Sequence, residues 1–593
     1  MSDEPEKYQG VHDFAPGIDI RHREQLEATQ RELREIPGVT ALIYDQTCAA
    51  EKRRRRKRGT YPDPDLRVFI NELVCEGCGD CSVKSNCLAV VPVETEFGRK
   101  RAIDQFSCNK DYSCLDGFCP SLVTVRGGKV RRGRTAATPA DAFAGLPEPA
   151  LPALARPYGI LVAGVGGTGV VTIGALVGMA AHLEGKGATV LDMTGLAQKG
   201  GAVMSHIRIA QRQDDLYSAR ITTGEANLVL GCDIIVTVSD DALSKTATGV
   251  TRAIVNSGRA ITGDFLRNPD HAFPISAMEQ SVVDAVGPDQ AEFLDAGRLA
   301  TLLLGHSIAT NIFMLGYAWQ KGLVPLSAEA LLRAIELNGA AVEENRRAFN
   351  WGRRAAHDPA GVEAIAQGGE AKLPTHRFSE SLDETIARRV AFLTDYQNTA
   401  YAERYAERVR RVRAGKAAPL ADAVARNYFK LLAYKDEYEV ARLFADAEFG
   451  QSLDAAFEGD YRLDFHVTLP WQRPAQDGAE PKKHRFGPWL LPAMRLLAKF
   501  RFLRGSALDP FARIPERKEE RRLIADYERL VDDLIARYEQ VDPEAALALA
   551  RLPESIRGYG PVKERAIAQA RATQAELEGK LLRRTPEVPA RAA

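Results

Sequence analysis

The stretch Cys75-Glu-Gly-Cys78-Gly-Asp-Cys81 governs how this chain is interpreted, because it places three cysteines at every third position. Thiolates with this spacing can hold three corners of an iron–sulfur cubane while a fourth thiolate arrives from elsewhere in the chain. The intervening Gly77 and Gly79 permit tight turns and let backbone N–H groups approach the cluster sulfides. The motif therefore predicts a 4Fe–4S cluster on Cys75, Cys78 and Cys81.

The fourth ligand has several candidates, because seven of the nine cysteines lie between Cys75 and Cys119. Cys119 precedes Pro120, and a Cys-Pro pair that closes a cysteine set is typical of ferredoxins, in which the last cysteine ligates the cluster begun by the other half. We therefore predict Cys119 as the fourth ligand, with Cys87 as the alternative. The leftover thiols of Cys87, Cys108 and Cys114 either hold part of a second cluster or are small buried side chains.

Zinc and disulfides are the competing interpretations of these cysteines. Zinc knuckles use two CxxC pairs separated by a spacer, whereas the second half here, Cys108-x5-Cys114-x4-Cys119, contains no CxxC. A disulfide framework is poorly supported in a large chain that shows no secretory signal. The pattern favours an iron–sulfur cluster over both.

Length and composition indicate a protein of several domains. At 593 residues the chain is long enough for roughly three to five domains. Lys+Arg and Asp+Glu both number 79, so the net charge gives no reason to expect nucleic acid or membrane partners. The most apolar stretch, Leu302 to Trp319, is interrupted by polar residues and predicts a buried helix. The N-terminus is polar and carries no targeting segment, so we expect a cytoplasmic protein.

The first 60 residues are too few to bury a core of their own. We predict a helix over Arg23–Glu35 and a compact buried strand over Val39–Asp45. Seven consecutive basic residues, Lys52 to Arg58, follow. Such a run is interpreted as a solvated connector, with nucleic-acid binding and contact with an acidic electron carrier as alternatives.

The rest of the chain divides by composition. Short strands, Leu66–Ile70 and Leu122–Arg126, flank the cysteines and suit a small ferredoxin-like fold. Farther on, continuous apolar strands alternate with helices, which indicates a Rossmann-like parallel sheet. The predicted segments are the N-terminal piece 1–60, the cysteine module 61–135, an Ala- and Pro-rich linker 136–157, the α/β domain 158–350, and a mostly helical region 351–593 that includes an amphipathic helix over 519–540.

A glycine loop opens the α/β domain, between a strand over Gly159–Ala163 and a helix over Val170–Glu184. Gly164, Gly166, Gly167 and Gly169 form a dinucleotide-type GxGxxG turn, and N–H groups at a helix N-terminus favour a phosphate. Asp192 closes the second strand, about where a ribose-binding acid would sit. The same glycines are equally compatible with close strand–helix packing alone.

A second glycine pair, Gly200-Gly201, follows the second strand and would let the backbone approach a ligand closely. The candidate ligand contacts beside it are Gln198, Lys199, Ser205, His206 and Arg208. For His206 and Arg208 the alternative is the solvated face of an alternating strand. Ala226–Leu230 and Asp233–Val238 are predicted as one interrupted strand or two, and Ala253–Asn256 as a further strand.

Four segments together resemble the large indolepyruvate ferredoxin oxidoreductase-like proteins: 42–51 with its basic extension, Cys75–Cys81, Cys108–Cys114 and Gly117–Pro120. Residues 158–350 resemble the gamma domain of 2-oxoacid:ferredoxin oxidoreductases, with both glycine sites. Residues 351–593 resemble the C-terminal extension of the long form of these enzymes, and 1–60 the tail of its thiamine-binding domain.

The resemblance implies an enzyme that oxidatively decarboxylates a 2-oxoacid, typically an aryl pyruvate, with coenzyme A as co-substrate. Thiamine diphosphate forms the carbanion-like intermediate, and electrons leave singly through iron–sulfur clusters to ferredoxin. The chain carries no Gly-Asp-Gly…Asn-Asn signature for thiamine diphosphate and magnesium. We therefore expect a subunit or C-terminal half that works in an oligomer with a thiamine-binding partner, its Gly164–Gly169 loop facing a phosphate of coenzyme A or of the partner's cofactor.

Two other functions stay open at the level of sequence. One is a non-catalytic assembly or interaction protein, a relic that keeps these domains without a thiamine-binding partner. The other is an NAD(P)-linked iron–sulfur reductase that uses the glycine loop.

Overall fold

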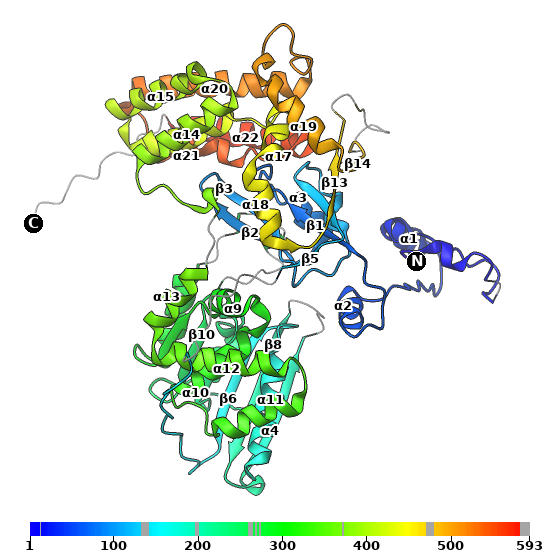
Figure 1. Cartoon of the computed structure of the whole chain (residues 1–593), viewed down its shortest axis with the longest axis vertical. Helices are drawn as coiled ribbons and strands as arrows, with labels where there is room; N and C mark the ends of the chain where they lie inside the picture. The colour runs from blue at the N-terminus through cyan, green and yellow to red at the C-terminus, as the bar shows by residue number, and fades with distance from the viewer. Residues whose placement is uncertain are drawn as a thin grey trace, which may run out of the picture. The chain divides into compact units, whose positions relative to one another are not determined.

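The computed structural model describes residues 1–11, 13–131, 142–195, 201–258, 265–266, 268, 270–271, 274–369, 373–469, 472 and 480–581 (Figure 1). Its contacts divide the chain into two units, Met1–Pro64 with Asn109–Asp111, and Asp65–Cys108 with Tyr112–Ala593. No helix of the described residues is long and apolar enough to cross a membrane.

The first unit contains short helices joined by extended chain: η1 (Pro5–Tyr8), η2 (Arg23–Gln25), α1 (Leu26–Arg34) and α2 (Ala49–Lys57). Helices η2 and α1 confirm the predicted helix. The predicted buried strand over Val39–Asp45 is wrong, because this stretch is extended but unpaired apart from a single bridge between Asp45 and Ser2. Val39 and Ile43 are 102% and 78% exposed, so β-branched residues alone did not make a strand here.

The basic run Lys52 to Arg58 lies mainly in helix α2. Glu51, at the start of this helix, pairs with Arg54 (Nε to Oε2, 3.2 Å) and with Arg55 (Nε to Oε1, 3.0 Å). A carboxylate in the first turn also complements the helix dipole, so one acidic residue compensates part of the repulsion along the run.

The cysteine module consists of two strand pairs and two short helical segments: β1 (Leu66–Ile70), α3 (Asp80–Ser85), β2 (Val90–Thr95), β3 (Gly98–Ile103), η3 (Ser113–Asp116) and β4 (Leu122–Arg126). Strand β1 pairs antiparallel with β4, and β2 pairs antiparallel with β3. The two strands predicted to flank the cysteines are therefore confirmed, and they are hydrogen-bonded to each other.

The C-terminal region extends this sheet, although it was predicted to be mostly helical. Strand β13 (Arg462–Val467) pairs antiparallel with β4, and β14 (His484–Phe486) pairs with β13, which gives the order β1-β4-β13-β14 among the described strands. A short strand β12 (Phe457–Glu458) also pairs with β5 (Lys129–Val130). The cysteine module and the C-terminal helices consequently share a hydrophobic core that contains Val123, Phe444 and Phe465.

The described strands of the α/β domain form a six-stranded sheet of order β11-β10-β9-β6-β8-β7. Their bounds are β6 (Tyr158–Val165), β7 (Gly187–Thr194), β8 (Ala202–Ala210), β9 (Leu228–Gly231), β10 (Arg252–Asn256) and β11 (Ala291–Leu294). Strands β6, β9, β10 and β11 are parallel, as predicted, but β8 runs antiparallel to both β6 and β7. The sheet is therefore mixed rather than wholly parallel.

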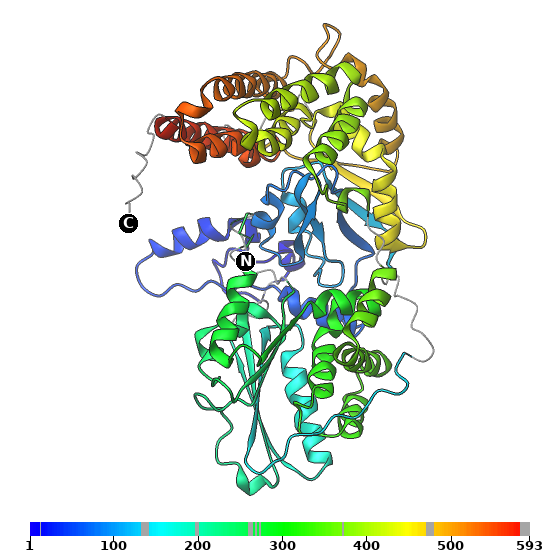
Figure 2. The ribbon, with the colours of Figure 1, turned by 90° about the vertical axis from the view of Figure 1, so that its left-hand side faces the viewer.

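Helices cover both faces of this sheet (Figure 2). Ile160 and Val162 of β6 belong to one core, with α4 and α10, while Leu161 and Ala163 belong to the other, with α5 and α8. This alternation follows from the two-residue period of a strand. The helices are α4 (Val170–Leu183), α5 (Ile234–Thr237), α6 (Asp240–Leu243), α8 (Ile275–Val286), α9 (Ala296–Leu304), α10 (Thr310–Gln320), α11 (Ala328–Asn338), α12 (Val342–His357) and α13 (Pro359–Gly369).

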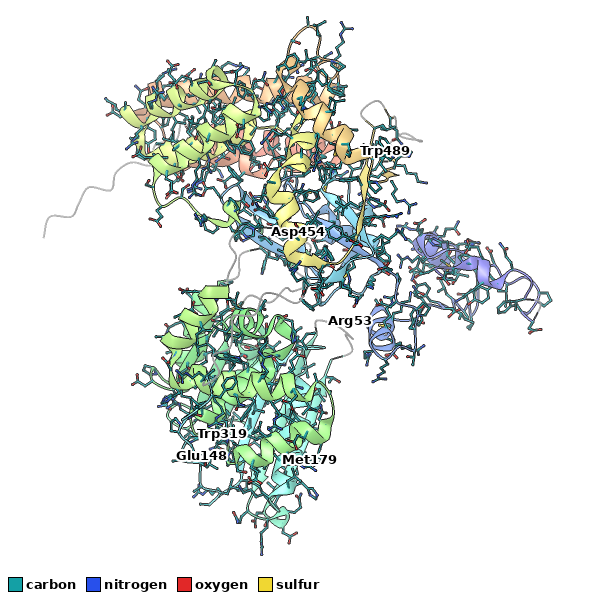
Figure 3. The ribbon with its side chains drawn as sticks, viewed as in Figure 1. Arg53, Glu148, Met179, Trp319, Asp454 and Trp489 are labelled. Atoms are coloured by element: carbon teal, nitrogen blue, oxygen red, sulfur yellow. The ribbon has the colours of Figure 1, made fainter. Side chains whose placement is uncertain are left out.

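Two details of this domain differ from the predictions. Asp233–Val238 was predicted as strand, but it contains helix α5, because the Asp233 carboxylate caps the helix by accepting the Val236 N–H (3.0 Å). The predicted buried helix over 302–319 is divided at Gly305 (φ 87°) between α9 and α10, and Trp319 of α10 is 1% exposed (Figure 3).

The C-terminal helices pack against one another around a core that contains Tyr405, Tyr428 and Tyr527. Helix α20 confirms the amphipathic helix predicted near 519–540, with Ile524, Val531 and Leu534 buried. The helices are α14 (Leu382–Tyr396), α15 (Thr399–Ala414), α16 (Ala421–Leu432), α17 (Glu437–Ala445), α18 (Ala447–Ala456), α19 (Leu490–Lys499), α20 (Pro515–Arg537), α21 (Pro543–Arg551) and α22 (Gly560–Leu581).

Candidate functional site

The predicted ligands Cys75, Cys78, Cys81 and Cys119 lie in one electrostatic environment. The first three occupy the loop between β1 and α3, and Cys119 lies just before β4, the partner of β1. Burial raises the pKa of the Cys78 and Cys81 thiols, and the nearby thiols of Cys119 and Cys75 raise it further. Burial also raises the pKa of Cys119, and Cys75 adds to that effect. The thiols of Cys75 and Cys119 are therefore near enough to affect the ionisation of those on the loop between β1 and α3.

The two glycines of the loop have backbone conformations that explain their presence. Gly77 has φ 67° and Gly79 has φ 80°, both in the left-handed region. A Cβ on Gly77 would overlap the carbonyl oxygen of Arg99. The Gly77 N–H donates to Cys75 Sγ (3.3 Å), so this turn directs a backbone donor at a sulfur.

Donors and positive charges surround the four thiols. Ser121 Oγ lies 2.7 Å from Cys119 Sγ, and Lys483 Nζ donates to the Gly117 carbonyl oxygen (2.5 Å). Burial lowers the pKa of Arg101, and the nearby Cys75 and Cys81 oppose that shift. Four thiolates crowded into a buried space would repel one another, and a bound positive centre offsets that repulsion. No group of three or more His, Cys, Asp or Glu side chains in the described residues is arranged to hold a single metal ion.

The individual glycines of the loop in the α/β domain have different structural roles. A Cβ on Gly164 would approach Val170 Cγ2 to 2.8 Å, so this glycine serves close packing. Gly167 (φ 87°) has open space around its Cα, and Gly169 (φ 107°) starts helix α4. The Gly166 N–H donates to the Gly201 carbonyl oxygen (2.7 Å), so the two predicted glycine sites meet.

The N-terminus of α4 has backbone N–H groups without intrahelical partners, and these suit an anion. Asn311 Nδ2 donates to the Thr168 carbonyl oxygen (3.2 Å), which braces the loop against helix α10. Gly200, Gln198 and Lys199 lie outside the described residues.

The polar residues predicted around this loop do not converge on it. Asp192 is exposed on β7, and β8 separates β7 from β6, so the carboxylate stands two strands, roughly 10 Å, from the expected ribose position. His206 is fully buried, and its Nδ1 accepts the Ile221 N–H (3.2 Å). Burial lowers the pKa of His206. The solvated face suggested for His206 is therefore wrong, whereas Arg208 pairs with Glu225 (3.7 Å); Ser205 is as buried as His206.

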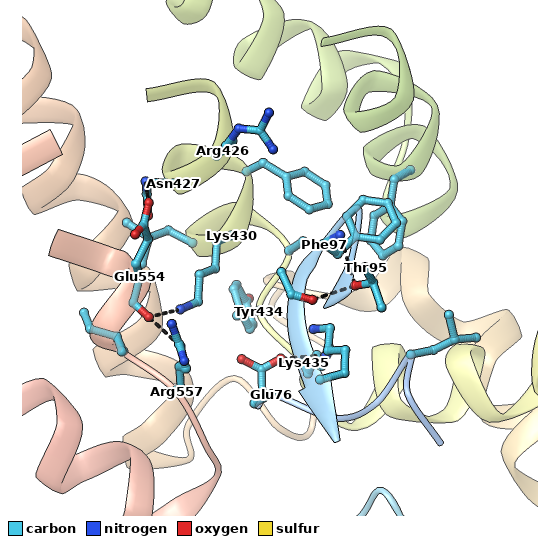
Figure 4. A pocket seen from close by; sticks show the side chains of 18 of the residues that line it. Glu76, Thr95, Phe97, Arg426, Asn427, Lys430, Tyr434, Lys435, Glu554 and Arg557 are labelled. Atoms are coloured by element: carbon cyan, nitrogen blue, oxygen red, sulfur yellow. Dashed lines mark hydrogen bonds and ion pairs between the residues drawn. The ribbon is translucent and has the colours of Figure 1, made fainter. Parts of the chain in front are cut away.

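A cavity of about 280 Å³ lies beside the cysteine loop, between the β2–β3 hairpin and the C-terminal helices (Figure 4). Lys435 Nζ reaches Glu76 Oε1 (2.6 Å) and the Cys75 carbonyl oxygen (3.1 Å). Burial opposes ionisation of Glu76, but Lys435 and the neighbouring lysines lower its pKa to about 2. Burial lowers the pKa of Lys430 to about 7. The sequence did not indicate this cavity, because its lining residues come from segments far apart in the chain.

Two family models match separate parts of the chain. Residues 159–355 match the family described as pyruvate ferredoxin/flavodoxin oxidoreductase. Residues 382–576 match a family of unknown function, DUF6537.

Curated relatives and a solved structure resemble about a third of the chain. The indolepyruvate oxidoreductase subunit IorB of Methanothermobacter thermautotrophicus is 29% identical over 201 residues, 34% of this chain and 97% of the relative. IorB of Pyrococcus horikoshii is 28% identical over 219 residues, 34% and 98% of the two chains. The keto/oxoacid ferredoxin oxidoreductase gamma subunit of Geobacter sulfurreducens covers 34% of this chain and 98% of its own at 25% identity, with a TM-score of 0.25. Together the family model and the curated relatives support an indolepyruvate/2-oxoacid ferredoxin oxidoreductase-like family for residues 159–355.

Proposed function

We propose that the chain relays electrons as a subunit of a 2-oxoacid ferredoxin oxidoreductase, through a 4Fe–4S cluster on Cys75, Cys78, Cys81 and Cys119. The observation that carries the proposal is that the four thiols lie on two segments that adjoin paired strands, where Cys119 and Cys75 affect the ionisation of Cys81. The family of residues 159–355 supports the reaction class, and an indolepyruvate-type substrate is the finer part of the proposal.

The residues around the thiols fit such a cluster. Four sulfur donors and N–H groups aimed at sulfur are what a cubane takes from a protein, and a bound cluster supplies one-electron chemistry. The chain's own groups then position the ligands: the Gly77 N–H and the Ser121 hydroxyl face sulfur atoms, and Lys483 holds the Gly117 carbonyl next to Cys119. The pairing of strands β1 and β4 at the base of the module supports the proposal of a ferredoxin-like fold.

The remaining chemistry is assigned to other molecules. Thiamine diphosphate and its magnesium ion would be carried by a partner subunit, which would deliver electrons from the 2-oxoacid to this cluster, and ferredoxin would accept them. The open position at Gly167 and the start of α4 would receive a phosphate of coenzyme A or of the partner's cofactor, next to the Gly166–Gly201 contact.

Removing one ligand tests the cluster. The full chain purified without oxygen should be brown and reducible, and Cys78→Ala should lose about four irons per chain relative to wild type. Cys48→Ala, which removes an exposed thiol outside the module, is the matched control and should leave iron and the EPR signal unchanged. A colourless wild type that carries stoichiometric zinc would contradict the proposal.

Co-purification from the native cells tests for the thiamine-binding partner subunit. We expect anaerobic affinity purification to yield a second polypeptide together with about one thiamine diphosphate per complex, detected by fluorescence after oxidation. The complex should reduce ferredoxin when supplied with an aryl pyruvate and coenzyme A. A solitary chain free of thiamine diphosphate would favour the non-catalytic relic instead.

A further inference from the structure

The cavity beside the cysteine loop has the size of a site for a small molecule. Its volume of about 280 Å³ is just below the range that drug-sized ligands occupy, so a smaller organic ligand would fill it. Its walls come from the β2–β3 hairpin, from the cysteine loop and from C-terminal helices that include α16, α20 and α22. No cysteine is among the described residues that line it, so the lining does not include the proposed cluster ligands.

Two lysines of the lining lack a carboxylate partner among the described residues. Lys100 of β3 is 8% exposed, and its ammonium group makes no ion pair or hydrogen bond with the part of the chain that the structure describes. Lys430 of α16 donates to backbone carbonyl oxygens, those of Pro553 (2.7 Å) and Glu554 (3.0 Å). Burying a charge without an opposite charge is costly, so the space beside these two ammonium groups suits an anion.

The carboxylates of the lining do not supply that charge, because each has another partner at 2.5–3.2 Å. The five pairs are Glu72 with His376, Glu76 with Lys435, Glu96 with Arg389, Glu520 with Lys563, and Glu554 with Asn427. Burial lowers the pKa of Lys430 to about 7 and that of Lys100 to about 8, and nearby cations add to both shifts. Lys100 is one of the cations that act on Lys430, so the two lysines lie near enough to face one ligand.

Aromatic side chains line another part of the cavity. Phe97, in the turn between β2 and β3, contacts Phe392 of α14 and Phe429 of α16, and the three ring centroids lie 5.2–5.5 Å apart. Figure 4 shows Phe97 and Lys430 on different sides of the cavity. Aromatic walls suit a flat apolar body, whereas ammonium groups suit a carboxylate, so the lining is matched to a ligand that has both.

We propose that this cavity binds a small carboxylate with an aromatic body, its charged end beside Lys100 and Lys430 and its ring beside Phe97 and Phe429. A bare inorganic anion fits less well, because it would leave the aromatic wall without a contact. Helices α16 and α20 belong to the region that matches a family of unknown function, so the proposal assigns a ligand to that region. The proposal does not rest on the iron–sulfur cluster or on the reaction of the enzyme.

The test measures binding of sodium phenylacetate to the full chain by isothermal titration calorimetry. Wild type should bind about one equivalent, and Lys100→Met and Lys430→Met should each weaken binding roughly tenfold or more, since each removes a charge-assisted contact. Arg426→Met is the matched control: Arg426 lines the same cavity one turn before Lys430 but pairs with Asp422 (3.0 Å), so the affinity should change less than about threefold. Thermal unfolding checks that each variant folds.

Two further probes test the chemical class on wild type, so they give an answer even where a lysine variant does not fold. Phenylethanol keeps the ring without the charge and acetate keeps the charge without the ring; each should bind at least about tenfold more weakly than phenylacetate. Equal binding of phenylethanol and phenylacetate, or tighter binding of inorganic phosphate, would overturn the assigned ligand class.

The variants test the site itself. Absence of phenylacetate binding, or equal affinity in wild type and both lysine variants, would overturn the proposal. An equal loss in Arg426→Met would show that the overall positive charge, rather than the two unpaired lysines, attracts the ligand, and would overturn their assignment. Iron content is measured separately, so each of these failures leaves the proposed function standing.

Discussion

Gly352→Ala is expected to unfold the α/β domain under conditions in which the wild-type domain is folded. Helices α10 and α12 cross at two facing glycines. A Cβ on Gly352 would overlap the Phe313 carbonyl oxygen, and one on Gly316 would overlap that of Phe349. Both obstacles are backbone atoms, so the added methyl fits only if the helices separate. We expect a loss of about 3 kcal/mol or more, well above the ~1 kcal/mol that alanine gains in helix propensity.

Gly368→Ala is the matched control, because Gly368 lies in the neighbouring helix α13 with open space around its Cα. There the same exchange should stabilise the chain by roughly 0.5–1 kcal/mol. Urea unfolding followed by tryptophan fluorescence measures the stability of this domain, since Trp319 and Trp351 are both buried in the core of α10 and α12. Equal midpoints for the two variants would show that the helices tolerate separation. Because Asn311 of α10 braces the glycine loop, Gly352→Ala should also disturb that loop.

Local sequence signals predicted the parts of the fold that depend on neighbours along the chain. The strands at Leu66–Ile70 and Leu122–Arg126, helix α4 and helix α20 all follow from apolar periodicity, and the structure has each of them. The thiol set on Cys75 and Cys119 was suggested by spacing and by the Cys-Pro pair, which are short-range signals as well. These features need no knowledge of what lies across the fold.

Strand pairing between distant segments explains the elements that the sequence did not predict. Strand β13 exists because β4, more than 300 residues earlier, offers it an unpaired edge (Asp464 opposite Thr124). The converse error is the strand predicted over Val39–Asp45: these residues favour a strand, but no neighbouring strand pairs with them in the described structure, and Val39 is exposed.

A buried ion pair joins the cysteine module to the C-terminal helices, and its loss should be the second large effect. Arg389 of α14 contacts Glu96, in the turn between β2 and β3, through Nη1 to Oε1 (2.6 Å) and Nη2 to the carbonyl oxygen (3.2 Å). Their side chains are 3% and 2% exposed. Burial opposes ionisation of Glu96, yet Arg389 and the Ser379 N–H lower its pKa below the usual value. The carboxylate is therefore kept charged by partners that cannot be replaced by water.

Arg389→Met should cost about 3–5 kcal/mol of unfolding free energy, because it leaves a buried carboxylate without its cation. Arg388→Met is the control: Arg388 is the preceding residue on α14, partly exposed and paired with Glu384, so its loss should cost less than about 1 kcal/mol.

The unfolding free energy that Arg389→Met loses should also depend on pH. Without Arg389, burial raises the pKa of Glu96, the folded state then binds the extra proton, and the loss should be larger at pH 8 than at pH 5. Adding Glu96→Leu should restore part of the stability. Urea unfolding at both pH values measures all four proteins, and equal losses for Arg389→Met and Arg388→Met would show that this contact does not hold the module to the helices.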